Sequence, residues 1–149
     1  MRHYGDITVG ETEEYGAYEV TKDEIIEFGR KYDPQPFHTD EEAARNSYFG
    51  ELVASGWHTA SICMRLSVEM KQREGHEPEN NLAGAGVDEL RWHEPVKPGD
   101  VLRIRREVVD KRPVESETAG GYIDARIEGI NQNDDVVISY VGKSLHGKR

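Results

Sequence analysis

The stretch ASGWHTASICMRLSVEMKQREG, residues Ala54–Gly75, holds the longest helical pattern of the chain and decides the fold. Small and apolar residues recur on one helical face, namely Trp57, Ala60, Ser61, Met64 and Val68. Spacings of three and four residues are typical of an amphipathic α-helix, and we expect this one to end near Lys71–Gly75. Charged residues dominate only the second half, so we expect a helix that is buried at its beginning and exposed at its end.

The chain that follows this helix changes to a strand pattern. Four segments separated by turn signals are predicted as strands: Leu82–Trp92, Val101–Asp110, Gly120–Ile130 and Val136–Leu145. In the third segment, Ile123, Ala125 and Ile127 alternate with polar residues, as in a strand with one buried face. A further strand is predicted before the helices, at Tyr15–Val20.

One antiparallel sheet wrapped around one long central helix accommodates this order of elements, which is the hot-dog architecture of the α+β class. A chain of 149 residues fits a single domain, so we predict one domain over residues 1–149. An unrelated α+β fold with the same elements is the alternative.

Two capping signals predict shorter helices ahead of the long one. The first is Thr21-Lys22-Asp23-Glu24, in which the Thr21 hydroxyl caps the helix and Glu24 reaches back to the Thr21 amide. Apolar positions then follow a helical spacing until Pro34 and Pro36 end the helix. The second signal, Thr39–Glu42, predicts a short helix through Ala43, Ala44 and Arg45.

The composition narrows the classes of partner. The chain has 19 Lys and Arg against 29 Asp and Glu, a net charge of −10, which disfavours nucleic acid. This acidity fits a surface adapted to high salt as well as an ordinary acidic protein. A single cysteine, Cys63, and the absence of a long apolar run or leader pattern lead us to expect a cytoplasmic protein without a membrane span. With only 36% hydrophobic residues, the core is expected to be thin or completed by a partner subunit.

Asp33 and His38 are candidates for acid–base chemistry, because they lie five residues apart on a loop stiffened by two prolines. Asp33 follows the first helix, where the helix dipole disfavours a carboxylate, so we expect a raised pKa. Histidine exchanges protons near neutral pH, and the two groups could act on one water. The alternative is an aspartate in a proline turn beside a surface histidine.

The start of the long helix is the second candidate. Helix N-termini present unpaired amides, and Gly56 has no side chain, so its N–H could bind a thioester oxygen. Gly56 could equally serve only the backbone geometry at the start of the helix. His58 could be a third participant in the chemistry, or a core or interface residue. His38, Asp40 and His58 match no compact ligand motif, so no metal is expected.

At these residues the sequence resembles the MaoC-like dehydratases, which include the (R)-specific enoyl-CoA hydratases. The matching segments are Tyr32–Asp40, Ala43-Ala44, Tyr48–Thr59 and Leu90–Asp100. The resemblance implies a hot-dog fold, a homodimer with the acyl pocket near the subunit interface, an acyl-CoA or related thioester as substrate, and no cofactor. It also implies that Asp33 and His38 activate water for the 2,3 bond of an enoyl thioester, while the Gly56 amide polarises the carbonyl.

Several positions depart from the family pattern. Tyr32 stands where the family has a glycine, and Gln35 stands where it has an asparagine. Ser55 replaces the histidine that precedes the glycine at position 56, and Trp57 and His58 follow that glycine. We expect Gln35, Ser55, Trp57 and His58 to contact the substrate. The acyl group of that substrate could be small, branched or dicarboxylic. A hot-dog acyl-CoA thioesterase and a non-catalytic acyl-CoA-binding module are the alternative functions.

Overall fold

The computed structural model describes residues 1–149 and contains one antiparallel sheet and one long helix. The strands are β1 (Thr12–Glu19), β2 (Asn81–Trp92), β3 (Val101–Pro113), β4 (Ala119–Ile130) and β5 (Val136–Gly147). The helices are a 3-10 turn (Tyr4–Asp6), α1 (Lys22–Tyr32), α2 (Pro36–Thr39), α3 (Glu41–Arg45) and α4 (Gly56–Gln72). No helix is long and apolar enough to cross a membrane.

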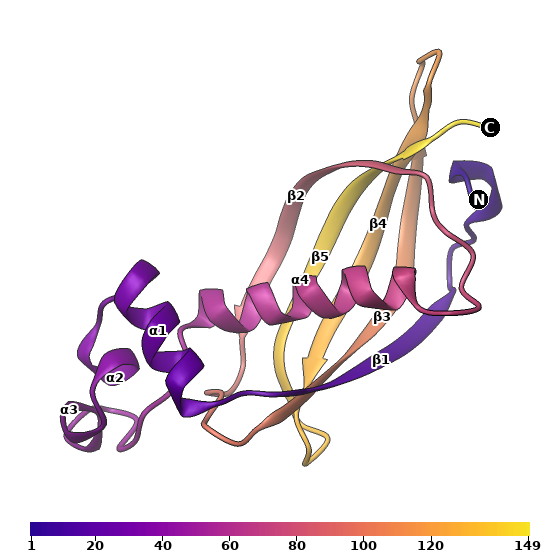
Figure 1. Ribbon diagram of the computed structural model, residues 1–149. Coiled ribbons are helices and arrows are strands. Elements are labelled where there is room, and N and C mark those ends of the chain that lie inside the picture. Colours follow the sequence, from indigo (N-terminus) through magenta and orange to yellow (C-terminus); the bar gives the residue numbers. More distant parts are fainter.

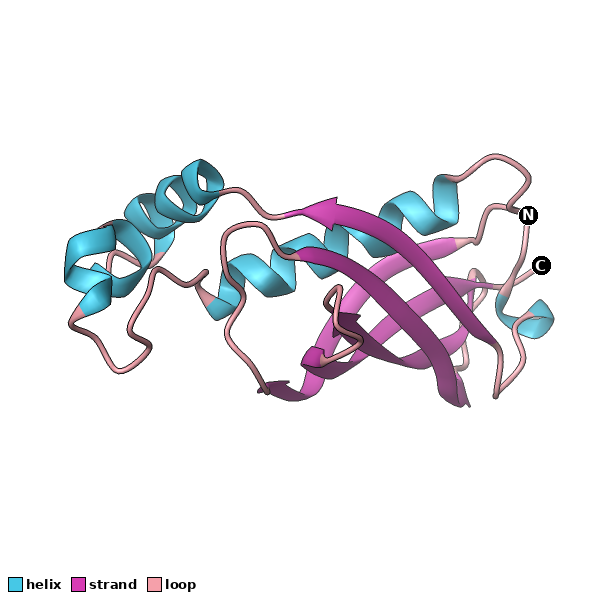
Figure 2. Ribbon diagram, turned by 90° about the horizontal axis from the view of Figure 1, so that it is seen from below, coloured by secondary structure: helices cyan, strands magenta, loops and turns pink.

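The sheet has the strand order β1-β3-β4-β5-β2, and every neighbouring pair is antiparallel. Helix α4 lies across one face of this sheet, and the small helices α1, α2 and α3 gather beyond the N-terminal end of α4 (Figure 1). Seen from below, the strands curve around α4 (Figure 2). The hot-dog fold predicted from the sequence is therefore confirmed.

Helix α4 joins the core through a face that the sequence pattern did not single out. Its buried residues are His58, Thr59, Ile62, Cys63, Leu66 and Met70. The apolar members of this set share one cluster with Leu102 and Ile104 of β3 and Val137 and Ile138 of β5. Burial does decrease along the helix as predicted, since four of these six residues lie in its first half, but a buried stripe continues through Leu66 to Met70. The predicted face, from Trp57 to Val68, lies largely on the outside.

The caps of the small helices differ in detail from the prediction. Thr21 caps α1 by accepting from the Glu24 N–H at 3.3 Å, but the Glu24 side chain bonds elsewhere and closes no capping box. The cap of α3 is Asp40, which accepts from the Ala43 N–H at 3.0 Å, because Thr39 already belongs to α2. Helix α2 is one turn long and was not predicted. These short elements fix the loop that carries Asp33 and His38.

Candidate active site

The structure brings Asp33 and His38 together at one end of helix α4. Asp33 is the C-cap of α1 and His38 lies in α2. The two side chains are 18% and 7% exposed, and His38 Nε2 lies 3.3 Å from Asp33 Oδ2. Pro34 and Pro36 fix the backbone between them, so little conformational freedom is lost in holding the pair.

The Asp33 carboxylate accepts two further hydrogen bonds. Gln35 Nε2 donates to Oδ1 at 2.7 Å, and Ser55 Oγ donates to Oδ2 at 2.7 Å. Burial raises the pKa of Asp33, but these two donors and the charge of His38 outweigh it and hold the pKa below its ordinary value. The expectation of a raised pKa was wrong, because direct donors act more strongly than a helix terminus.

His38 is oriented by the backbone of the segment that precedes α4. Its Nδ1 lies 2.6 Å from the carbonyl oxygen of Val53. A carbonyl oxygen only accepts, so Nδ1 carries a hydrogen and donates it. Nε2, which faces Asp33, is therefore the ring atom that gains and loses a proton.

Helix α1 approaches His38 at Gly29, which is buried in the middle of the helix. A Cβ atom on Gly29 would lie 2.7 Å from the carbonyl oxygen of His38 and 3.0 Å from its Cβ. Only glycine permits this approach, so Gly29 sets the distance between α1 and the backbone of His38.

Helix α4 contributes its N-terminus to the same place. Ser55 is its N-cap and accepts from the Trp57 N–H at 3.3 Å, while its hydroxyl hydrogen goes to Asp33. The Gly56 N–H is the first of the helix and has no acceptor within it. Trp92 Nε1 donates to the Gly56 carbonyl at 2.8 Å, and its ring occupies the space that a Cβ on Gly56 would need. Gly56 is thus packed against Trp92 and directly follows Ser55, whose hydroxyl contacts Asp33.

The remaining two predicted substrate contacts differ in accessibility. Trp57 is exposed and packs edge to face on Trp92, with ring centroids 5.2 Å apart. His58 is buried, and its Nε2 lies 2.8 Å from Glu24 Oε1. A role for either residue in substrate binding remains a prediction.

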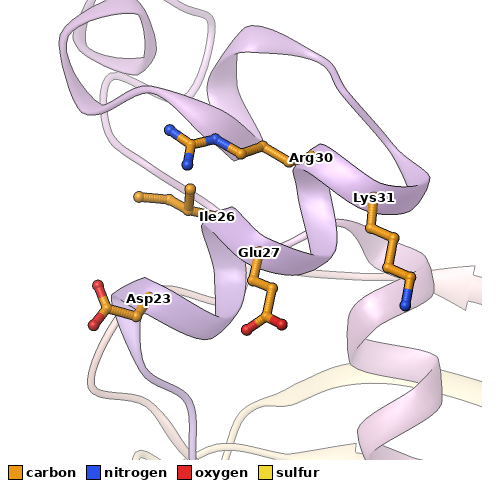
Figure 3. Close-up of a pocket in the computed structure, with 5 residues that line it drawn as sticks. All are labelled: Asp23, Ile26, Glu27, Arg30 and Lys31. Atoms are coloured by element: carbon orange, nitrogen blue, oxygen red, sulfur yellow. The ribbon is translucent and has the colours of Figure 1, made fainter.

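Hollows elsewhere on the protomer are lined by neither Asp33 nor His38. One of about 540 Å³ lies on the outer face of α1, where only its own side chains line it (Figure 3). A larger groove of about 640 Å³ lies between α4 and strands β2, β4 and β5, and includes Val68, Val87 and Tyr140.

The family model described as "MaoC like domain" matches residues 7–126. The chain belongs to this MaoC-like family. A relative from Bacillus subtilis, the uncharacterized protein YdeM, is 32% identical over 129 residues, which cover 87% of each chain. The MaoC-like dehydratase of Rhodospirillum rubrum has a solved structure that is 36% identical with a TM-score of 0.86, covering 99% of this chain and 97% of that one. The mesaconyl-CoA hydratase of Cereibacter sphaeroides is 40% identical over 70 residues, 47% of this chain but 20% of that protein.

Sequence reasoning missed several residues of this MaoC-like site. Val53 and Trp92 carry no chemical signature, since they act through a backbone carbonyl and an indole. Gly29 did carry a signal, because a glycine inside a helix costs stability and calls for a packing reason.

Proposed function

We propose that the protein is a hydratase or dehydratase that adds water to, or removes it from, the 2,3 bond of an acyl thioester. The observation that supports this most is the contact of Asp33 with His38 and with Ser55, the N-cap of α4, since Gly56 then follows with its first-turn amide. A proton-transferring pair next to a donor for a developing oxyanion is what such an addition requires.

In the hydration direction, the pair removes one proton from a water as the water oxygen bonds to C3. The electron pair of the 2,3 bond shifts to the thioester oxygen, where the Gly56 N–H stabilises the enolate. The pair then returns one proton to C2, so the site ends in its starting protonation state. Asp33, whose pKa is lowered, begins as a carboxylate and can accept the first proton.

The names of the relatives agree with this chemistry, because one is a mesaconyl-CoA hydratase and another a MaoC-like dehydratase. The direct test is to incubate the protein with short, branched and dicarboxylic enoyl-CoA thioesters. Hydration removes the absorbance of the conjugated thioester without releasing thiol. Release of free thiol would show a thioesterase instead, and binding without any product would show a non-catalytic module.

We further propose that the functional unit is a homodimer formed through β2 and α4. Strand β2 is an edge of the sheet, and almost its whole length is exposed. Six apolar side chains on these two elements are each 45% to 58% exposed: Trp57, Met64 and Val68 on α4, and Leu82, Val87 and Trp92 on β2. An edge strand beside an exposed apolar helix stripe fits a second copy of this chain, which would continue the sheet.

Such pairing would join the candidate site of one copy to the groove of the other. The Trp92 end of β2 contacts Gly56, whereas Asn81, Gly84 and Val87 line the groove near the opposite end. An antiparallel pair of β2 strands about a two-fold axis places unlike ends side by side. We therefore propose that the groove receives the acyl group that reacts at the Asp33–His38 pair of the partner.

A charged residue in the middle of β2 should break this dimer. Val87→Asp introduces a carboxylate that must be buried without a partner, so we expect monomers in sedimentation equilibrium and at least about a tenfold loss of hydration rate. Val109→Asp on β3 adds the same charge at another exposed apolar site and should leave both properties unchanged. A Val87→Asp variant that remains dimeric would contradict the proposed interface.

A further inference from the structure

A second cluster of ionisable side chains joins helix α1 to helix α4. Glu24 Oε1 accepts from the Tyr18 hydroxyl at 2.5 Å and lies 2.8 Å from His58 Nε2. The His58 side chain is only 4% exposed and stacks on the ring of Phe28, with centroids 4.8 Å apart and planes 9° from parallel. Burial and the hydrogen bond to Glu24 raise the pKa of Tyr18 to about 12, so its hydroxyl remains a donor.

This cluster lies on the two helices that carry the halves of the candidate active site. Helix α1 ends at Asp33, and helix α4 begins at Ser55, whose hydroxyl donates to Asp33. Ser55 and His58 are three residues apart and therefore lie on the same side of the first turn of α4. Along α1, Glu24 and Asp33 are separated by about 13 Å of helix. Two polar links thus connect α1 to the start of α4, one near each end of α1.

Helix α1 is held by apolar packing as well as by polar links, since Ile25 belongs to the core cluster and Gly29 lies against the backbone of His38. A single hydrogen bond such as Ser55 to Asp33 adds only about 1 kcal/mol to this packing. A second link with a buried, stacked imidazole therefore adds a further restraint on how α1 is oriented against the first turn of α4.

We propose that Glu24 and His58 are positioning residues: they fix α1 against the first turn of α4 and so keep the Asp33 carboxylate bonded to Ser55 and in contact with His38. The inference rests on the proposed function, because it gives this clasp, Glu24 with His58, a role in the same acid–base reaction. Neither residue touches the reacting atoms. Tyr18 supports the clasp from β1, and Arg65 of α4 lies over the Tyr18 ring at 5.6 Å.

The test compares His58→Ala and Glu24→Ala with two controls. Glu24→Gln keeps an oxygen that can accept from both Tyr18 and His58, so it should retain the wild-type rate. Glu27→Ala removes an equal charge from an exposed position on the same helix and should also have no effect. For the two clasp variants we expect kcat to fall by about 10- to 100-fold, with little change in KM, because misplacement affects the reacting geometry more than binding.

A second readout separates positioning from general loss of stability. The groups that face Asp33 are Gln35, Ser55 and His38, and their contacts hold its pKa down. If the clasp opens and Ser55 moves away, the pKa of Asp33 rises, and the acid limb of the kcat/KM profile shifts to higher pH. Carbon-13 NMR titration of the Asp33 carboxyl group measures the same shift without any substrate.

The outcomes distinguish the inference from the function on which it rests. If the wild-type protein turns over no thioester, the hydratase proposal is overturned. A raised Asp33 pKa in His58→Ala would in that case still support the coupling between the clasp and Asp33. Reduced kcat with an unchanged Asp33 titration would show that the clasp stabilises the fold only. Unchanged kcat and titration in both alanine variants would also overturn the positioning role.

Discussion

We expect Asp33→Asn and His38→Asn each to lower the rate of enoyl-thioester hydration by about 100- to 10 000-fold, the range that general acid–base groups contribute. In Asp33→Asn, the amide is nearly the same size but cannot hold a negative charge or take a proton from water. In His38→Asn, the shorter amide can still donate to the Val53 carbonyl, as His38 Nδ1 does at 2.6 Å. That variant removes the outer half of the ring, which carries Nε2, the atom that faces Asp33.

Stopped-flow loss of the conjugated thioester absorbance measures these rates, and thermal unfolding measures stability in parallel. Ser55→Ala is a graded control, because it removes one donor to Asp33 and leaves the carboxylate in place. The acid limb of the kcat/KM profile of Ser55→Ala should move to higher pH, since the pKa of Asp33 rises when the Ser55 hydrogen bond is lost. Asp33→Asn should have no such limb. Rates within a few-fold of wild type in both asparagine variants would refute the acid–base role.

Local patterns in the sequence were sufficient for the strands, the longer helices and the fold class. The period-2 pattern around Ile123–Ile127 corresponds to β4, and the helical repeat from Trp57 corresponds to α4. The sequence did not reveal which face of α4 is buried, because this helix has two apolar stripes. The stripe through Ile62 and Leu66 packs on the sheet, whereas that through Trp57 and Met64 remains outside. Only the position of the sheet decides between them.

The candidate site contains contacts that local sequence patterns could not predict. Asp33 and His38 are near each other in sequence, and a proline-stiffened loop was enough to suggest them as an acid–base pair. The groups that control them come from farther away: Ser55 lies 22 residues from Asp33, and Val53 lies 15 residues from His38. The predicted sign of the Asp33 pKa shift was wrong because it counted the helix dipole and left out the donors to the carboxylate. Gln35 lies only two residues from Asp33, whereas Ser55 is brought to it by the fold.

The same long-range packing gives the second large effect, at Gly29. Gly29→Ala places a methyl group 2.7 Å from the His38 carbonyl oxygen, which is closer than real Cβ contacts allow. Backbone atoms must move to relieve this overlap, so α2 and His38 shift away from α1. We expect a loss of about 1 to 3 kcal/mol in the free energy of unfolding. The rate should fall by about 100-fold, because a shift of about 1 Å in a reacting group is sufficient for such a loss.

The sign of the stability change distinguishes this prediction from the usual effect of alanine in a helix. Alanine in place of glycine inside a helix normally stabilises it by about 0.5 to 1 kcal/mol, so a helix without this contact would become more stable. Gly5→Ala is the matched control, because a Cβ on Gly5 meets nothing within 4 Å and should leave rate and stability near wild type. Chemical denaturation and the hydration assay measure both quantities. A more stable and fully active Gly29→Ala protein would show that His38 does not depend on the close approach of α1.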